Sequence, residues 1–409
     1  MNNRIPFYSF AIFFGAGSNF LFFLFSAVAL DSVRFSEIAY FLTIFSIFLF
    51  ISNHVVEPFI FSIRCRSDSD SLEKISSLVG CFCFFSFLCI SALFTFTTYH
   101  STADWFSFIL LFFTVVMISF SGVWLTRLRF EGRSDSVVWL NNILRPSLLY
   151  FSAIGFWFFT LPLELAYLIS FCVLGLFGFG AEFRRRSKFF WGLLRLRPGI
   201  ILVQDLLNFG CAPLALSVVP QIDVLVVNYL FGAEAVGVYK LAVTISLLAL
   251  VPLAGGTILV SKEMVGLSRQ RVGLGLVGRL RRICLLCLIG SVSIYLASVG
   301  CVWLLVESAI ISFEGLFRLT LILGMGMVAI GFTGFNFFVL QTFGSGEGFI
   351  KLICYWWVFH LILSVGFGSV FGLVGFAVGA CAGMVMLSCL VSERVHSLWG
   401  VNFGFFPVR

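Results

Sequence analysis

Apolar residues occur along this chain in long runs that short polar segments separate. Many runs approach the roughly 20 residues that a helix needs to cross the hydrocarbon core of a bilayer. They do not alternate between apolar and polar residues, as the strands of a membrane β-barrel would. The pattern predicts an all-α, polytopic membrane protein of about 12 transmembrane helices. We expect the spans near 6–30, 38–60, 77–98, 105–126, 137–160, 163–182, 201–230, 234–259, 280–304, 316–340, 350–370 and 372–391.

Composition supports the membrane assignment. Hydrophobic residues make up 60% of the chain and charged residues 11%, whereas an ordinary soluble domain has roughly 25% charged residues. The first apolar run starts near Ile5 and is too long for a signal-peptide core, so we interpret it as a span. The 12 cysteines lie mostly inside apolar runs, and no Cys/His cluster lies in polar sequence. We therefore expect no disulfide framework, no metal site and no cofactor.

The distribution of charge predicts an orientation. If the N-terminus is cytoplasmic, most of the 26 Lys and Arg fall in cytoplasmic segments, and the outside loops hold only Arg34 and Arg318. This is the asymmetry of the positive-inside rule, and it places both termini in the cytoplasm. The outside loops are all short, which leaves no room for an extracytoplasmic catalytic domain. We expect a protein that is not an enzyme.

The chain also reads as two halves. Segments 29–48 and 229–248 share a pattern in which a span ends, a short acidic turn follows, and a Tyr opens the next span. Six spans in each half, both starting inside, predict parallel repeats, related by an axis along the membrane normal. We divide the chain into an N-terminal lobe (1–183), a cytoplasmic amphipathic linker (184–199), a C-terminal lobe (200–392) and a cytoplasmic tail (393–409). Cations alternate with aromatic and aliphatic residues in the linker, so we expect it to bind anionic lipid headgroups.

Polar residues inside the fifth span form the first candidate site. Arg145 lies between Asn141 and Asn142 on one side and Pro146 on the other, and Asn141 shares its helix face at a four-residue offset. A charge at bilayer depth costs roughly 2.5–3.5 kcal/mol on insertion scales, so such residues usually face the bundle interior or water. We predict that Arg145 lines a cavity.

A second group lies around the seventh and eighth spans. Asp223 and Asn228 mark the far end of the seventh, and Lys240 lies early in the eighth. Lys240 either lines the same cavity or makes a structural contact, by extending outward or by pairing with Asp223 or Glu234. In the first case these side chains would line an aqueous path between the two lobes.

Two acids lie nearer the span ends. Glu57 closes the second span beside Pro58, and Asp205 marks the start of the seventh. Both fit headgroup depth, and together with Asp223 they remain candidates for ion coupling.

The segment "IDVLVVNYLFGAEAVGVYKLAVTI" (222–245) resembles a motif of bacterial polysaccharide exporters, and "FGLVGFAVGACAG" (371–383) is similar to their final hairpin. These are the O-antigen and capsule flippases of the multidrug/oligosaccharidyl-lipid/polysaccharide (MOP) exporter superfamily, with a MATE-like fold. The residues that match the first motif are Asp223, Leu230, Phe231, Gly232, Val236, Gly237 and Tyr239.

The resemblance implies transport of a polyprenyl-pyrophosphate-linked oligosaccharide across a bacterial inner membrane by alternating access. Arg145 and Lys240 would attract the pyrophosphate, and Asn141, Asn142 and Asn228 would meet sugar hydroxyls. The substrate, membrane lipids and the glycan polymerase machinery are the implied partners, and nucleic acid is not among them. A drug or small-molecule antiporter of the same superfamily is the closer alternative, ahead of a flippase for the peptidoglycan precursor. A membrane-embedded glycan polymerase is disfavoured because no sizeable outside loop is present.

Overall fold

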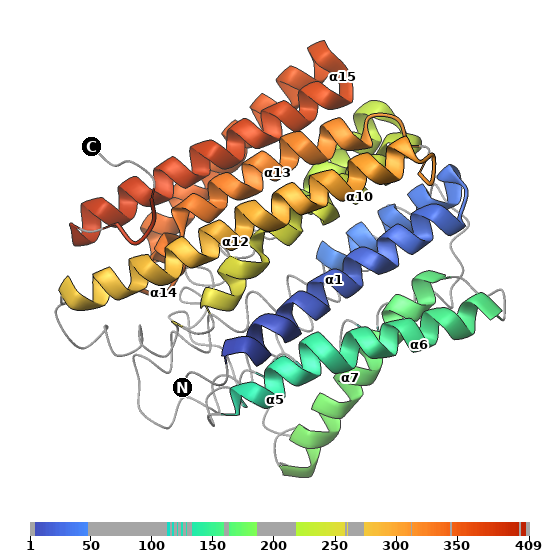
Figure 1. Cartoon of the computed structure of the whole chain (residues 1–409), viewed down its shortest axis with the longest axis horizontal. Helices are drawn as coiled ribbons and strands as arrows, with labels where there is room; N and C mark the ends of the chain where they lie inside the picture. The colour runs from blue at the N-terminus through green and yellow to red at the C-terminus, as the bar shows by residue number, and fades with distance from the viewer. Residues whose placement is uncertain are drawn as a thin grey trace, which may run out of the picture. The chain divides into compact units, whose positions relative to one another are not determined.

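In the described part of the chain, every secondary-structure element is a helix (Figure 1). The computed structural model describes residues 5–47, 133–158, 163–185, 218–257, 274–311, 313–343, 346–400 and 402–405, with isolated positions between 113 and 128 and Val260. By contacts the chain divides into two compact parts. Unit 1 consists of Met1–Tyr40 and Val219–Arg409, and unit 2 of Phe41–Val218. The lobes predicted at 1–183 and 200–392 stay a prediction.

Unit 1 contains most of the described helices. It opens with α1 (Ile5–Ala29) and the start of a helix over 32–47, and it continues with a helix over 218–231. There follow α10 (Ala233–Leu247), the 3₁₀ turn η3 (Leu248–Leu250), a helix over 251–257, α12 (Leu274–Glu307), α13 (Leu316–Thr333), α14 (Asn336–Phe343) and α15 (Gly346–Trp399). Unit 2 contains α5 (Ser134–Trp139), the π-helical turn η2 (Leu140–Leu144), α6 (Arg145–Phe158) and α7 (Leu163–Arg185).

The helix bounds agree with the predicted spans wherever both can be compared, to within several residues at the ends. The largest shift is in the last span, expected to end at 391, whose helix continues to Trp399. The third span and most of the fourth lie outside the described residues. Within the described part, five helical stretches are long and apolar enough to cross a membrane, namely Phe10–Ala29, Ala233–Thr257, Gly278–Glu307, Leu316–Thr333 and Gly348–Trp399.

The last of these stretches is a hairpin. A straight helix of the 54 residues of α15 would be about 80 Å long, far more than the bilayer core. Gly372 divides it, with φ 67° and ψ −155°, a conformation that glycine adopts without the steric cost of a Cβ. The two arms pack closely: a Cβ at Gly379 would lie 2.4 Å from the Leu363 carbonyl oxygen, and one at Gly375 2.3 Å from that of Phe367. Small residues at three- and four-residue spacing along the hairpin allow this close packing.

The two similar segments of the sequence form similar hairpins that touch. Asp31 Oδ1 accepts a hydrogen bond from the Arg34 amide at 2.8 Å in the first turn, and Gly232 makes the second turn with φ 85°. A Cβ at Gly237 would lie 2.6 Å from Ser36 Oγ and 2.9 Å from the Phe35 ring. The second hairpin therefore needs a glycine where the first one packs against it.

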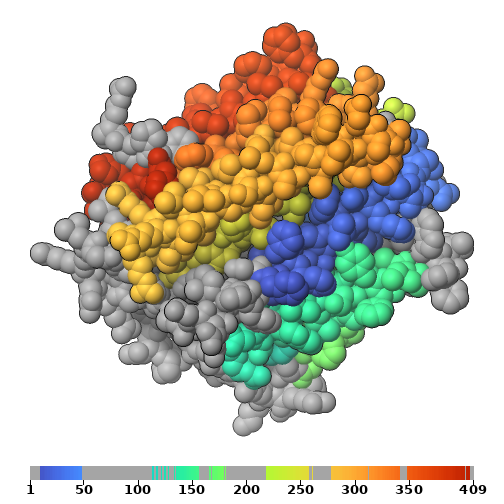
Figure 2. All heavy atoms as spheres, in the orientation of Figure 1, coloured from blue at the N-terminus to red at the C-terminus, as the bar shows by residue number. Residues whose placement is uncertain are grey.

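The outer surface of the helices is apolar. Side chains of α12 and α13 cover much of the face shown in Figure 2, and Leu286, Leu296 and Leu304 of α12 are exposed. In unit 2, Phe151 of α6 is 76% exposed. Apolar surface on this scale marks contact with a membrane or a partner, and with the long apolar helices it indicates a multi-pass membrane protein.

A polar cluster fixes segment 402–405 to the helices of unit 1. The helix breaks at Gly334, between α13 and α14, and Asn336 follows the break. Asn336 Nδ2 donates to Asn402 Oδ1 at 2.6 Å and to Ser392 Oγ at 3.1 Å, while its Oδ1 accepts from the Phe403 amide at 2.8 Å. Asn402 Oδ1 also accepts from the Gly404 amide at 2.8 Å. We refer to Asn336, Ser392, Asn402 and the 403–404 backbone as the asparagine cluster.

Candidate functional site

The helix over 218–231 carries two polar side chains into the apolar interior of unit 1. Gln221 and Asp223 are both buried, at 4% and 1% exposure. Because they lie two residues apart on a helix, they point in different directions. Each finds a partner on a different element, so this helix connects two separate polar pairs.

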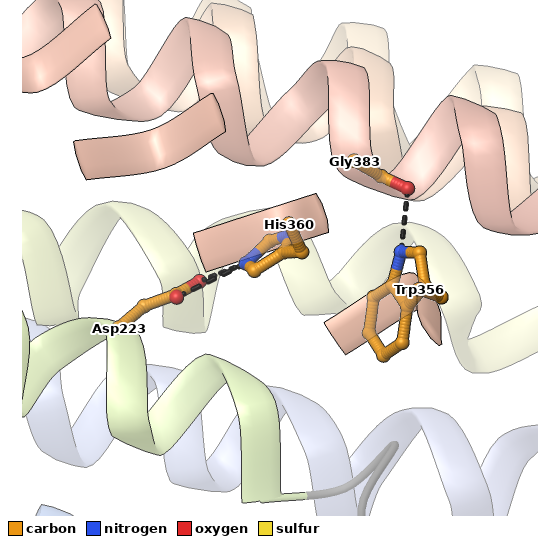
Figure 3. A network of polar contacts seen from close by, with 4 residues as sticks. All are labelled: Asp223, Trp356, His360 and Gly383. Carbon is orange, nitrogen blue, oxygen red and sulfur yellow. Dashed lines mark hydrogen bonds and ion pairs between the residues drawn. The ribbon is translucent and has the colours of Figure 1, made fainter. Parts of the chain in front are cut away.

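Asp223 pairs with His360 in the first arm of α15 (Figure 3). His360 Nε2 lies 3.0 Å from Asp223 Oδ1 and 3.1 Å from Oδ2, and both side chains are almost completely buried. The two residues are 137 positions apart in the sequence. Buried charges in proteins are generally paired in this way, since an isolated one would lose its hydration without compensation.

The surroundings hold His360 from two sides. Trp356, one turn earlier, packs its ring 5.3 Å from the imidazole and donates from Nε1 to the Gly383 carbonyl at 2.7 Å (Figure 3). Gly383 lies in the second arm of α15, where a Cβ would approach His360 Nδ1 to 2.4 Å. Tyr239 of α10 stacks edge-on against Phe376 at 5.6 Å. Its hydroxyl lies beside Asp223 but makes no well-formed hydrogen bond.

Lys240 belongs to the other pair. Its Nζ donates to Gln221 Oε1 and lies 6.0 Å from the centroid of the Phe23 ring in α1. The side chain is buried, so it does not extend outward. The structural alternative of a bridge to Asp223 or Glu234 is not what the described residues show, because Asp223 pairs with His360 and Glu234 is exposed.

The predicted residues of the fifth span lie together in unit 2. Asn141 and Asn142 belong to the π-helical turn η2, and Arg145 follows it directly. Pro146 has no N–H, so the Asn142 carbonyl four residues earlier lacks its usual helical donor, and the wider turn before the proline accommodates this. The Arg145 guanidinium lies 4.5 Å above the Phe171 ring of α7, and Asn142 Nδ2 donates to the Val138 carbonyl at 3.3 Å. Asn141, Asn142 and Arg145 are all half-buried.

The remaining predicted site residues do not belong to the Asp223–His360 pair or to the Gln221–Lys240 pair. Asn228 is half-buried near the turn at Gly232, and its carbonyl accepts from the Gly232 amide. Glu57, Asp205 and linker residues 186–199 lie outside the described residues. No group of three or more His, Cys, Asp or Glu is placed to hold a metal ion in the described part of the chain.

Sequence reasoning missed His360 altogether. It stands alone in the run "YWWVFHLIL", where a histidine is easily taken for an ordinary core residue. The available signal was that an ionisable residue inside a span needs a partner, and Asp223 was an acid of the same half without one.

Comparison with solved structures identifies this arrangement of helices. The outward-facing form of a multidrug resistance MATE family transporter of the MOP superfamily aligns over 97% of this chain and 96% of its own, with a TM-score of 0.66 and 18% identity. The chain has the MATE fold. A mutant of the Vibrio cholerae MATE transporter VcmN gives a TM-score of 0.69 at 15% identity, over 99% of this chain and 98% of that one.

A MOP superfamily transporter of Pyrococcus furiosus, described as having a binding pocket of reverse polarity, gives a TM-score of 0.64 at 18% identity, over 97% and 95% of the two chains. No family model and no curated protein matches the sequence. The all-α MATE fold confirms the predicted fold class. The number of spans stays a prediction.

Proposed function

We propose that this chain is a MOP-type transporter that moves a polyprenyl-pyrophosphate-linked oligosaccharide from the cytoplasmic to the periplasmic leaflet by alternating access. Two observations support it. The helices adopt the fold of MATE transporters, and segments 222–245 and 371–383 resemble the polysaccharide exporters. Such a substrate joins an anionic, sugar-rich headgroup to a lipid tail. Its path needs cations and hydrogen-bonding groups inside the protein.

The observation that carries the proposal is the buried environment of the Lys240 side chain. Its ammonium is buried and bonded to the neutral side chain of Gln221, and no carboxylate among the described residues pairs with it. A buried cation without a counter-ion is costly. Binding of an anion offsets that cost, which makes Lys240 suited to a pyrophosphate once the transport cycle uncovers it.

Unit 2 contributes a second set of groups with the same chemistry. Arg145 presents a guanidinium, which binds phosphate through paired hydrogen bonds, and Asn141 and Asn142 present amides that suit sugar hydroxyls. The π-helical turn that carries the two amides is a feature often found at functional sites.

The test measures flipping directly. The full-length protein is placed in liposomes with a fluorescent polyprenyl-pyrophosphate-linked oligosaccharide, and a membrane-impermeant quencher reports which leaflet holds the label. We expect wild type to flip the lipid, Lys240→Gln to lose most of this activity and Lys240→Arg to retain part of it. The control is Lys351→Gln, which removes an exposed lysine of α15. Normal flipping by Lys240→Gln at normal abundance would refute the role of the buried cation.

An antiporter for drugs or small molecules is the second candidate. The solved neighbours include multidrug resistance transporters, and the buried acid Asp223 is a group that organic cations favour. Cells that lack the gene can be used to distinguish the two functions. Accumulation of lipid-linked repeat units with loss of surface glycan supports the flippase. Unchanged glycan with increased sensitivity to cationic drugs supports the antiporter.

The membrane context extends the proposal. We place the protein in a bacterial inner membrane with both termini in the cytoplasm, with the linker at 184–199 bound to anionic headgroups and the glycan polymerase machinery as a further partner. Labelling of single cysteines introduced near the two ends of the chain in intact cells tests the orientation, because a periplasmic terminus would react with an impermeant reagent.

A further inference from the structure

Helix α12 presents one continuous exposed face along its length. Of the five long apolar stretches in the described part of the chain, the one in α12 is the least buried. Exposed residues recur along it at spacings of three, four or seven, which place them on one side of a helix. They include Arg279, Arg282, Leu286, Ile289, Leu296 and Trp303. An exposed face of this length contacts lipid or another chain.

The chemistry of this face changes along the helix. It begins with two arginines, continues with mainly apolar side chains, and ends near Trp303. Roughly 21 residues separate Arg282 from Trp303, which corresponds to a rise of about 30 Å and to the thickness of the hydrocarbon core of a bilayer. Tryptophan favours the membrane interface, and Glu307, the single acid of α12, lies beyond it. The face therefore fits a bilayer, with Arg279 and Arg282 at the headgroup level of one leaflet.

The arginines at the start of this face are crowded. Arg279, Arg281 and Arg282 lie within one turn of α12, and all three are exposed. Nε of Arg281 donates to the Asn402 carbonyl at 3.0 Å, so this guanidinium is directed toward segment 402–405. Arg279 and Arg282 share the outer face at a three-residue offset, and like charges at such a spacing repel each other. An anion bound between them would offset this repulsion.

A lipid phosphate is the anion that suits this pair. A guanidinium binds phosphate through paired hydrogen bonds, and arginines next to a transmembrane helix attract anionic headgroups. One to two turns further along the same face, Leu286 and Ile289 are 69% and 55% exposed. The start of α12 thus places cations at headgroup depth beside an exposed apolar surface, as the two parts of a phospholipid require.

We propose that the start of α12 binds an anionic phospholipid, whose phosphate contacts Arg279 and Arg282 and whose acyl chain lies along Leu286 and Ile289. Charge complementarity favours this occupant over a zwitterionic phospholipid, whose net charge is zero. It also disfavours a second copy of the chain, because in a two-fold symmetric contact through this face the same arginines of both copies would meet at the same depth. With the orientation predicted from the distribution of charge, the site lies in the cytoplasmic leaflet. This lipid site requires only the membrane location of the chain and goes beyond the proposed transport.

The first test measures lipid affinity. Native mass spectrometry of the full-length protein in detergent follows binding of the first added lipid, with phosphatidylglycerol as the anionic probe and phosphatidylcholine as the zwitterionic one. We expect wild type to bind phosphatidylglycerol at least about tenfold more tightly. The Arg279→Gln, Arg282→Gln double variant should lose most of this difference, while its unchanged affinity for phosphatidylcholine shows that it folds.

The control for this test is Arg318→Gln, which removes an exposed arginine of α13. We expect it to bind both lipids as wild type does. Equal affinities of wild type for the two lipids would overturn the site, and this result requires no variant to fold. Wild-type affinity of the double variant for phosphatidylglycerol would also overturn it. So would an equal loss in Arg318→Gln, because the total charge of the protein would then decide the affinity.

The second test locates the lipid and identifies its source. Phosphatidylglycerol with a photoreactive group in one acyl chain is crosslinked to the full-length protein in nanodiscs, and the labelled peptides are identified. We expect labelling at residues 286–289 that unlabelled phosphatidylglycerol displaces and inorganic phosphate does not. Displacement by inorganic phosphate, or by undecaprenyl pyrophosphate at a lower concentration than phosphatidylglycerol, would overturn the assignment to a phospholipid. Neither test measures flipping, so a protein that binds phosphatidylglycerol here but never flips the oligosaccharide contradicts the proposed function alone.

Discussion

Two buried polar clusters of unit 1 differ in whether their members can change charge. The asparagine cluster joins neutral groups, and Asn336 uses both its donors and its acceptor on Ser392, Asn402 and the Phe403 amide. The Asp223–His360 pair joins two titratable groups and leaves Nδ1 of the imidazole unused. Both lie in the interior of the same helical unit, so the contrast comes from the side chains rather than from the depth of burial.

The difference teaches what each cluster is suited for. A fully satisfied neutral network has one low-energy arrangement and holds its segments together under all conditions. A pair of chargeable groups with an unsatisfied ring nitrogen is costly to bury in an apolar interior. The first is suited to fix segment 402–405, whereas the second places chargeable side chains at the contact between the helix over 218–231 and α15.

The largest expected effect comes from placing a charge in the neutral cluster. Asn336→Asp removes the donors to Ser392 Oγ and Asn402 Oδ1 and buries a carboxylate next to an oxygen. We expect the free energy of unfolding to fall by about 3 kcal/mol or more, measured by denaturation of the purified protein in mild detergent. Ser397→Ala, which removes an exposed hydroxyl, is the control. A fall below about 1 kcal/mol would show that the cluster does not hold segment 402–405.

The next largest effect is expected from a substitution in the backbone segment of the asparagine cluster. A Cβ at Gly404 would lie 2.3 Å from the Thr333 carbonyl oxygen and 2.6 Å from that of Phe332, and neither can rotate away. We expect Gly404→Ala to cost about 1–3 kcal/mol and to release the Phe405 amide from the Phe332 carbonyl. Hydrogen exchange at Phe405 reports the release. Gly366→Ala is the matched control, because a Cβ there meets nothing within 4 Å; equal exchange in the two variants would contradict the docking of this segment.

These two clusters also show how far the sequence could lead. Hydropathy predicted a break between the spans expected at 350–370 and 372–391, where Gly372 divides the helix, because hydropathy depends only on residues that are neighbours in the sequence. Asp223 and Lys240 stood out because charges in apolar runs are costly. Their partners could not be read, since Gln221 and His360 lie 19 and 137 residues away and only the packing of the helices brings them near.

The asparagine cluster and the π-helical turn went unnoticed for related reasons. Asn336 and Asn402 carry no charge, so nothing in the sequence marks them as buried. The turn at Leu140–Leu144 depends on how Pro146 disturbs the hydrogen bonds before it. Periodicity detects that a helix is present, whereas it does not register one widened turn within it.

A smaller effect is expected where an added methyl group meets a side chain instead of the backbone. A Cβ at Gly383 would lie 2.4 Å from His360 Nδ1, and the imidazole can turn away from it. We expect Gly383→Ala to cost about 1 kcal/mol, less than Gly404→Ala, since the obstacle is movable. The turned ring loses its alignment with Asp223, and ¹⁵N NMR of histidine-labelled protein would report this as a shifted His360 signal. An unchanged signal together with a larger loss of stability would show that the arms of α15 separate instead.

The smallest change in stability is expected when the chargeable pair is made neutral. In Asp223→Asn, the amide oxygen still accepts from His360 Nε2, so one hydrogen bond remains while the buried carboxylate disappears. The variant loses a hydrogen bond to a charged acceptor but no longer buries a charge, and these two effects oppose each other. We therefore expect the free energy of unfolding to change by no more than about 1 kcal/mol. Asp223→Ala leaves His360 without any partner and should cost about 3 kcal/mol. Unfolding of the single variants and of the Asp223→Asn, His360→Gln double variant gives the coupling between the two residues. A large loss in Asp223→Asn would mean that the pair serves stability as the asparagine cluster does.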